Sequence, residues 1–225
     1  LEWNLVNGSC VSKDEVVIDF GVDNPIVEAG PSDTVCGTTI QLNATPFAPG
    51  TGTWKKITGP GDVLFFPDSI TPDAHAFITK GNEGKYTFEW KMVSGSCVPV
   101  FDTVTVLYNK IPEQPVTYAD SSCGPQSMHL SSDVGQFGTY NYWYDDEFAG
   151  NRMDTALDIS TTILSSTTAY WVSTYNDSTG CESGRKEVLA KVFTIPERPV
   201  LTNLENCGDE TLTMNGAVGA NGNTI

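Results

Sequence analysis

Residues that could carry out catalysis are scarce in this sequence of 225 residues. The only two histidines are His75 and His129, and both lie in stretches where apolar and polar residues alternate. His129 stands between Met128 and Leu130, which we expect to face a core, so its imidazole should face solvent on a strand. The sequence contains no nucleophile elbow of a Ser-His-Asp triad, no His-Glu-x-x-His motif and no phosphate-binding loop. We therefore expect no catalytic residue and no enzymatic activity.

The densest acidic cluster is Asp145-Asp146-Glu147. A glycosidase would need two carboxylates about 5 to 10 Å apart in a cleft, which a small β-sandwich does not offer. Calcium takes about six to eight oxygen ligands, and the sequence has no Asp-x-Asp-x-Asp-Gly loop. The favoured interpretation is a solvated turn after a strand at 140–144. A calcium ion bound by this loop is the alternative, and we expect no other metal or cofactor.

Aromatic residues dominate the expected strand at 140–144, where three tyrosines alternate with Asn141 and Trp143. Because successive side chains of a strand point to opposite faces, one aromatic set must face outward. An exposed tyrosine row could stack on sugar rings, or it could flank an interface between modules. The candidate ligand contacts are Tyr140, Tyr142, Tyr144, Asp145 and Asp146.

Composition narrows the class of protein and of partner. The chain has 28 acidic and 12 basic residues, a formal net charge of −16, which argues against nucleic acid and anionic membrane surfaces as partners. No apolar run approaches the roughly 18 residues of a membrane span, so we expect no membrane insertion. With 21 Gly, 13 Pro and few strong helix formers, the composition indicates an all-β chain with many turns.

Two repeats give the expected domain organisation. Residues 1–11 match residues 88–98 at seven of eleven positions, 87 residues apart. Residues 111–116 and Cys123-Gly124 recur as 195–200 and Cys207-Gly208, 84 residues apart. Modules of this length fit small β-sandwiches. We expect the tail of a module at 1–20, whole modules at 25–108 and 116–193, and the head of another at 199–225.

Strand patterns within each module predict tandem antiparallel sandwiches. Tyr86–Val93 alternates apolar and polar residues, and 102–108 should return beside it as the partner strand. The five tryptophans lie in expected strands, and the repeat-equivalent Trp3 and Trp90 should be core residues. Further strands are expected at 16–18, 39–43, 52–57, 140–144, 169–175 and 185–193. Short proline-rich linkers should act as semi-rigid spacers at Asn24-Pro25-Ile26, 111–115 and 195–199.

Six cysteines fit this modular organisation. In each whole module, one cysteine precedes an early strand and the other lies in the last hairpin loop, and we expect both at one end of the sandwich. The predicted disulfides are Cys36–Cys97 and Cys123–Cys181. Cys10 and Cys207 are left unpaired in this stretch of chain. Zinc is disfavoured because closely spaced cysteine pairs are absent, and disulfides indicate an oxidising, extracellular compartment.

The modules resemble a known class of repeat. The first type looks like the PKD/Ig-like repeats of giant cell-surface proteins of Bacteroidetes, and the second resembles an Ig-like module of the same proteins. The first resemblance rests on Ala29-Gly30-Pro31, Cys36, Gly52-Thr53-Trp54, Gly59-Pro60-Gly61 and Gly95-Ser96-Cys97 before 102–106. The second rests on Cys123-Gly124, Tyr142-Trp143-Tyr144-Asp145, 168–172 and Gly180-Cys181.

This resemblance implies a function without catalysis. Such chains are commonly gliding-motility adhesins or related surface proteins exported by the type IX system. We therefore expect a structural and adhesive stalk segment on a bacterial cell surface. Its partners would be neighbouring Ig-like modules of the same chain, and surface polysaccharide or other surface proteins. The alternative is a non-catalytic carbohydrate-binding or spacer region of a large secreted polysaccharide-degrading enzyme.

The same resemblance implies glycosylation. Secreted proteins of Bacteroidetes carry O-glycans at Asp-Ser/Thr followed by an apolar residue or Thr, and the sequence has five such triplets. The alternative interpretation is that Asp-Ser/Thr marks turns and strand starts, where both residues cap the backbone. The candidate O-glycosylation residues are Thr34, Ser69, Thr103, Thr155 and Ser178, of which Ser69 and Ser178 lie in expected loops.

Overall fold

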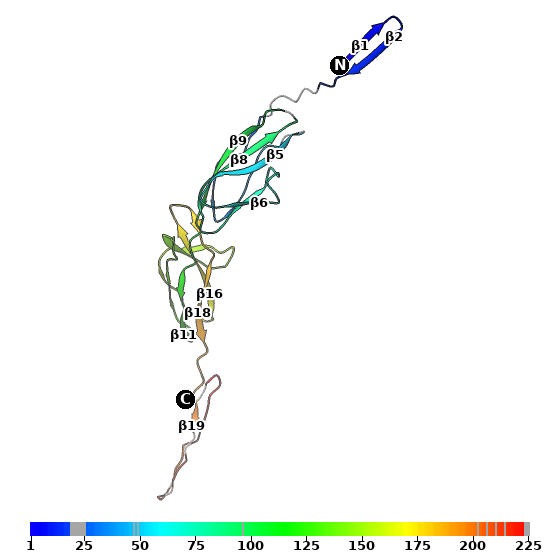
Figure 1. Ribbon diagram of the computed structural model, residues 1–225. Coiled ribbons are helices and arrows are strands. Elements are labelled where there is room, and N and C mark those ends of the chain that lie inside the picture. The colour runs from blue at the N-terminus through cyan, green and yellow to red at the C-terminus, as the bar shows by residue number, and fades with distance from the viewer. Residues whose placement is uncertain are drawn as a thin grey trace. The chain divides into compact units, whose positions relative to one another are not determined.

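The computed structural model describes residues 1–18, 26–46, 48, 50–95, 97–201, 203–205, 207–209, 211–213 and 215–222, and these residues form strands and connecting loops without a helix (Figure 1). The all-β prediction is therefore confirmed. No helix in the described part of the chain is long and apolar enough to span a membrane. The chain forms two compact units, Leu1–Lys110 and Ile111–Ile225, a coarser division than the four predicted segments. The predicted linker residues 24 and 25 lie outside the described residues.

The first unit begins with an antiparallel hairpin. Strands β1 (Glu2–Asn7) and β2 (Cys10–Glu15) pair from Glu2↔Glu15 to Asn7↔Cys10. All side chains of both strands are exposed, and Trp3 is 74% exposed. The prediction of a core role for Trp3 is thus wrong for the described structure, because no second sheet among the described residues covers the hairpin. The strand expected at 16–18 is also absent, since β2 ends at Glu15.

The first sandwich packs two sheets around one core. One sheet has the order β3-β9-β8-β5 and the other β4-β7-β6, and Figure 1 shows β8, β9 and β5 running side by side. Strands β8 and β9 form its longest ladder, in register from Gly84↔Tyr108 to Met92↔Val100. The strands are β3 (Asp33–Cys36), β4 (Thr39–Gln41), β5 (Thr51–Thr58), β6 (Val63–Phe66), β7 (His75–Ile78), β8 (Gly84–Val93) and β9 (Val100–Asn109).

The alternating faces of β8 and β9 build this core. Tyr86, Phe88 and Trp90 on β8 are at most 1% exposed, as period-2 alternation predicts. Trp54 on β5 pairs in register with Trp90, and the ring centroids lie 4.9 Å apart. The indole of Trp90 occupies the space beside the backbone of Gly52, where an added Cβ would lie 1.8 Å from the ring. This close approach explains why a residue without a side chain stands in β5.

The second unit contains a sandwich of the same general kind. One sheet has the order β10-β12-β15, and the other β11-β18-β16-β13-β14 with β17 paired to β16. Its apolar core gathers Leu130, Trp143 and Val172, all 0% exposed, with Val188 and Ala190 beside them. The strands are β10 (Val116–Tyr118), β11 (Asp120–Cys123), β12 (His129–Asp133), β13 (Tyr140–Tyr144), β14 (Arg152–Asp154), β15 (Asp158–Ser160), β16 (Thr168–Asn176), β17 (Cys181–Glu182) and β18 (Lys186–Phe193).

A polar network completes the core of the second sandwich. Asn141, fully buried, donates from Nδ2 to Ser132 Oγ at 2.9 Å and accepts at Oδ1 from Thr174 Oγ1 at 3.1 Å. The backbone N–H of Thr174 donates to Ser183 Oγ at 2.9 Å. Because each buried polar group has a partner, this network fixes how three strands and a loop pack together.

Strand pairing repeats along the second unit with the offset found in the sequence. Val116 pairs with Asp133 in β10 and β12, and 84 residues later Val200 pairs with Ala217 in β19 (Val200–Leu201) and β20 (Gly216–Ala217). The backbone hydrogen bond from Glu113 N–H to Gln136 O, 2.9 Å, likewise recurs from Glu197 N–H to Ala220 O, 3.0 Å. The sequence repeat is therefore also a repeat of backbone contacts.

One feature of the sheets differs from the predicted antiparallel arrangement. The first strand of each large sheet runs parallel to the last: β3 pairs with β9 from Asp33↔Val106 to Cys36↔Asn109, and β11 pairs with β18 from Asp120↔Ala190 to Cys123↔Phe193. The remaining pairings are antiparallel. Each large sheet is thus mixed, because its first strand lies on the outer edge of its last strand and follows the same direction.

Substitution of Gly52 by Ala tests the packing of the first core. The new Cβ would overlap the buried Trp90 ring, so Gly52→Ala should lower the free energy of unfolding by about 1–3 kcal/mol. Thr53→Ala is the matched control, since Thr53 is exposed on the same strand. This substitution should lower the free energy of unfolding by less than about 0.5 kcal/mol. Equal denaturant midpoints for the two variants would contradict this account.

Candidate functional site

The outer face of β13 and β16 concentrates the aromatic side chains of the second sandwich. Tyr140, Tyr142 and Tyr144 of β13 lie in register with Tyr175, Ser173 and Trp171 of β16. The ring centroids of Tyr140 and Tyr142 lie 5.1 Å apart, and Tyr175 lies 5.4 Å from the first and 5.1 Å from the second. We call this face, with the two arginines that cover it, the tyrosine–arginine face.

Two arginines cover the tyrosines. The guanidinium carbon of Arg152, at the start of β14, lies 3.3 Å from the centroid of the Tyr142 ring, and that of Arg185 lies 3.4 Å from the Tyr144 ring. Arg185 also donates from Nη1 to the carbonyl oxygen of Asp146 at 2.6 Å. A guanidinium stacked on an aromatic face is held by cation–π attraction and excludes water from the ring.

Hydrogen bonds fix the tyrosine hydroxyls of this face. Tyr144 donates to Glu182 Oε1 at 2.6 Å, and Ser173 donates to the same oxygen. The hydroxyls of Tyr140 and Tyr142 lie 2.9 Å apart. Hydrogen bonding to Tyr142 and partial desolvation raise the pKa of Tyr140 to about 12. The rings are therefore held in place by their hydroxyls as well as by the arginines above them.

The prediction of an exposed tyrosine row is wrong for two of its three members. Tyr142 and Tyr144 are only 7% and 4% exposed, and Tyr140 is half-buried. The outer surface of this face belongs instead to Arg152, which is exposed, and to half-buried Arg185 and Trp171. A partner would meet guanidinium groups stacked on aromatic rings, so the face suits an anionic or carboxylate-bearing surface better than the flat stacking of a neutral sugar.

The acidic cluster at residues 145–147 forms part of a hydrogen-bonded turn. Asp145 accepts from the backbone N–H of Asn151 at 2.6 Å and from its Nδ2 at 3.1 Å, and these bonds lower the pKa of the Asp145 carboxyl. Asp146 accepts from the backbone N–H of Phe148 at 3.1 Å. The predicted solvated turn is what the structure contains. Across the described residues, no group of three or more His, Cys, Asp and Glu side chains is arranged to hold a metal ion.

Both histidines lie on strands, as the sequence predicts. His129 is exposed at the start of β12 between buried Met128 and Leu130, and its Nε2 lies 3.7 Å from Asp158 Oδ1. His75 is half-buried at the start of β7, with its ring 6.2 Å from that of Phe77. His129 also pairs in register with Ser160 of β15.

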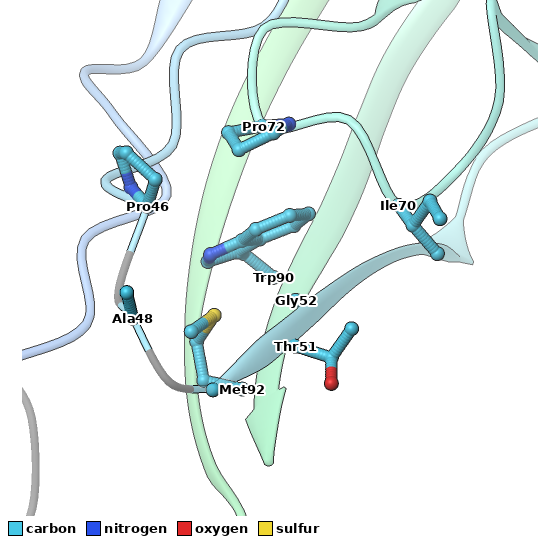
Figure 2. A pocket seen from close by; sticks show the side chains of 9 residues that line it. Pro46, Ala48, Thr51, Gly52, Ile70, Pro72, Trp90 and Met92 are labelled. Atoms are coloured by element: carbon cyan, nitrogen blue, oxygen red, sulfur yellow. The ribbon is translucent and has the colours of Figure 1, made fainter. Parts of the chain in front are cut away.

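A cavity of about 390 Å³ lies beside Trp90 in the first sandwich (Figure 2). Among the described residues, Trp90 Nε1 is the one buried side-chain nitrogen or oxygen without a hydrogen-bond partner, whereas Trp54 Nε1 donates to Pro72 O at 3.0 Å. This cavity could not be predicted from the sequence, since its wall joins two loops to two strands. It is lined by Pro46, Ala48, Gly50, Thr51, Gly52, Ile70, Pro72, Trp90 and Met92. This mainly apolar cavity therefore offers one unpaired donor.

The candidate glycosylation residues differ in exposure. Thr34, Thr103, Thr155 and Ser178 are exposed, whereas Ser69 is half-buried and its carbonyl accepts from the backbone N–H of Trp54. Three of the neighbouring aspartates accept backbone N–H groups one to three residues later, as turn-capping residues do: Asp33, Asp68 and Asp154. Ser178, in the β16–β17 turn, is therefore the more accessible of the two favoured positions.

The cysteines do not pair within modules as predicted. Cys10, Cys97, Cys123 and Cys207 are free thiols. The predicted bonds Cys36–Cys97 and Cys123–Cys181 are therefore not those of the structure. The reason lies in the parallel pairing of each first strand, which carries its cysteine away from the hairpin loop that holds the other.

Part of the chain matches a known family of Ig-like domains, and solved structures similar to the chain are known. Residues 112–193 match the family described as "Ig-like domain CHU_C associated". No curated protein matches the chain. Among solved structures, the chain is similar to CbhA fibronectin(III)-like modules of Clostridium thermocellum, with 13% identity, coverage of 83% of this chain and 100% of that one, and a TM-score of 0.40. It is also similar to a complex of Dpr2 Ig1-Ig2 with DIP-Theta Ig1-Ig3, with 12% identity, coverage of 76% and 100%, and a TM-score of 0.41.

The pH dependence of tyrosine ionisation tests the tyrosine–arginine face. Because the pKa of Tyr140 rises from about 10 to about 12 on folding, its contribution to stability is fully present below pH 10 and is lost as the pH rises through 12. Tyr142→Phe removes the main cause and should move one tyrosinate transition in the ultraviolet absorbance titration downward toward 10. Tyr118→Phe, remote from this face and bonded to Asp133, should leave that transition in place. An unchanged titration in Tyr142→Phe would refute the assignment.

Proposed function

We propose that the chain is a structural and adhesive stalk segment of a large, repetitive bacterial surface protein. The observation that carries the proposal is the recurrence of module contacts at a fixed offset, with Val116↔Asp133 repeated as Val200↔Ala217. A repeated Ig-like unit with short connections extends reach along a chain without requiring a catalytic centre. The Ig-like match over residues 112–193 supports the module type.

Proline-rich connections support a spacer role. Pro112 and Pro115 are buried, and the backbone N–H of Glu113 donates to Gln136 O at 2.9 Å. A linker held in this way has few conformations available and suits a semi-rigid connection. The acidic surface, with a net charge of −16, would keep neighbouring copies apart and soluble. We place the protein outside the cell, exported by the type IX route, and assign it to surface adhesion linked to gliding motility.

The tyrosine–arginine face is the surface we assign to adhesive contact. Arg, Tyr and Trp are the residue types that dominate binding energy at protein interfaces. Arg152 and Arg185 are two of only 12 basic residues, and both present guanidinium groups on rigid strands or beside them. Its partner would be an acidic surface protein or an acidic polysaccharide.

Two measurements test this proposal. Antibodies against residues 25–193 should label intact cells of the native organism, and deletion of those residues in frame should reduce attachment to surfaces while export persists. Labelling only after permeabilisation would refute the surface location.

A glycan array distinguishes the alternative function. The isolated chain should bind neutral polysaccharides weakly, and Arg152→Ser with Arg185→Ser should reduce any binding to acidic glycans by about tenfold, the loss of roughly 1.4 kcal/mol. Lys85→Ser with Lys91→Ser, on the first sandwich, is the matched control. Tight binding to one neutral polysaccharide would favour a carbohydrate-binding region of a secreted polysaccharide-degrading enzyme instead.

We also propose O-glycans at the exposed Asp-Ser/Thr positions, Ser178 first. Glycans on an exposed turn add bulk without disturbing the core. The intact mass of the protein from its native organism should exceed the mass of the polypeptide. The Ser178→Ala variant should be lighter by the mass of one glycan. A native mass equal to that of the bare polypeptide would disprove the modification.

A further inference from the structure

Strand β5 lies at the edge of its sheet, which has the order β3-β9-β8-β5. In an antiparallel pair, residues that exchange backbone hydrogen bonds with the neighbouring strand alternate with residues whose N–H and C=O point away from it. The backbone N–H of Trp54 donates to Ser69 O at 2.6 Å, so the backbone groups of Trp54 point away from β8. Gly52 lies two residues earlier in the same ladder, opposite Met92. Its N–H and C=O therefore also point away from β8.

These two backbone groups of Gly52 lack a partner. Gly52 is a buried residue of β5, and no hydrogen bond joins its outward N–H and C=O to any residue that the structure describes. Buried backbone groups are nearly always paired, because an unpaired one costs about as much free energy as a lost hydrogen bond. One donor and one acceptor from outside the sandwich would complete this edge of the sheet.

Trp90 adds an unpaired side-chain donor at the same place. Its side chain is 1% exposed, and Nε1 has no hydrogen-bond partner. An added Cβ on Gly52 would lie 2.5 Å from Cε2, the ring atom to which Nε1 is bonded. Figure 2 shows Nε1 on the side of the ring that faces Ala48 and Met92, two of the residues that line the cavity of about 390 Å³. The backbone groups of Gly52 and the donor of Trp90 thus belong to one site.

Hydrogen bonds hold the wall of this site that follows β6. Asp68 Oδ1 accepts from the backbone N–H of Ile70 at 3.0 Å and from that of Thr71 at 2.9 Å. Pro72 O accepts from Trp54 Nε1 at 3.0 Å. Ile70 and Pro72 both line the cavity. A wall held in this way before a ligand arrives reduces the entropy lost on binding.

The chemistry of the site suits a peptide strand. None of the described lining residues is charged, so an inorganic ion would find no opposite charge there. A residue placed opposite Gly52 in an antiparallel pair would donate its N–H to Gly52 O and accept from Gly52 N–H at its C=O. Its side chain would lie on the inner face of the sheet, where Gly52 has none, beside Trp90, Ile70 and Met92. A peptide also carries a carbonyl oxygen at every residue, so it can supply an acceptor for Trp90 Nε1.

We propose that the edge of β5 and the cavity beside Trp90 form a peptide-binding site. It takes an extended peptide strand, which adds to the sheet beyond β5 and places a small apolar side chain in the cavity. In this mode of recognition, main-chain hydrogen bonds supply affinity and the pocket for a side chain supplies specificity. The site lies within the first unit and uses no residue of the tyrosine–arginine face. It goes beyond the adhesive function proposed above and does not depend on it.

A nuclear magnetic resonance titration of the 225-residue chain with a defined peptide tests the site. The probe is the acetylated and amidated heptapeptide Ser-Thr-Ser-Val-Ser-Thr-Ser, in which the single valine fixes the register opposite Gly52. The backbone N–H of Gly52 and the indole N–H of Trp90 should shift downfield together, with one dissociation constant, because both gain an acceptor. Absence of both shifts up to the solubility limit of the peptide would overturn the proposal.

Two methylated peptides distinguish strand addition from filling of the cavity alone. Methylation of the valine nitrogen removes the donor to Gly52 O and leaves the side chain unchanged, so affinity should fall by about tenfold, the effect of one hydrogen bond. Methylation of the next serine nitrogen is the matched control, since that N–H points away from β5 and its loss should change affinity little. Equal affinities of the two methylated peptides would overturn the proposal.

A pair of isoleucine substitutions locates the site on the protein. Ile70 lines the cavity and is 56% exposed, whereas Ile57 is 45% exposed on β5 and does not line it. Ile70→Arg should place a charge at the cavity and abolish the peptide-induced shift of Gly52 N–H. Ile57→Arg, the matched control, should bind the peptide as the unaltered chain does. Binding that persists in Ile70→Arg, or that is lost equally in both variants while their thermal unfolding curves match that of the unaltered chain, would refute the assignment.

Discussion

In each large sheet, the first strand pairs in parallel with the last strand. This pairing is the constraint that determines where the linkers and cysteines of each module lie. The backbone hydrogen bonds between β3 and β9 join two strands that run in the same direction, one at the start of the module and one at its end. The same holds for β11 and β18. A parallel connection needs a long crossover, and here the rest of the sandwich is that crossover. The module consequently receives the chain at one end and releases it at the other.

Local patterns were sufficient to predict much of the fold. Period-2 alternation located β8, β9, β13, β16 and β18 to within about two residues, because the apolar face of a half-buried strand is visible in the sequence itself. Strand direction is not visible there, since the same alternation fits a parallel or an antiparallel neighbour. The predicted cysteine pairs were wrong for this reason. The cysteines that are equivalent in the two modules were correctly recognised from the repeats. The end of the sandwich at which Cys36 and Cys123 lie, however, depends on strand pairing with residues about 70 positions later.

The tyrosine–arginine face shows a second limit of sequence reasoning. Alternation in residues 140–144 correctly separated Trp143 and Asn141 from the tyrosines, yet burial of Tyr142 and Tyr144 depends on Arg152 and Arg185, which come from other strands or loops. A charged residue in a sequence is usually assigned to solvent. Here the planar guanidinium lies flat on an aromatic ring, so that one of its faces packs on the ring and the other is available for contact. The acidic turn was predicted correctly because its hydrogen bonds are made within seven residues.

The parallel pairing of first and last strands also determines how each module would carry mechanical load. A pull on the chain before β3 and after β9 acts at opposite ends of one ladder, because the two strands run in the same direction from Asp33↔Val106 to Cys36↔Asn109. The hydrogen bonds of that ladder would be loaded in shear, all together, rather than opened one after another. The same geometry recurs in β11 and β18, from Asp120↔Ala190 to Cys123↔Phe193. Each module would therefore resist extension until this ladder fails as a whole.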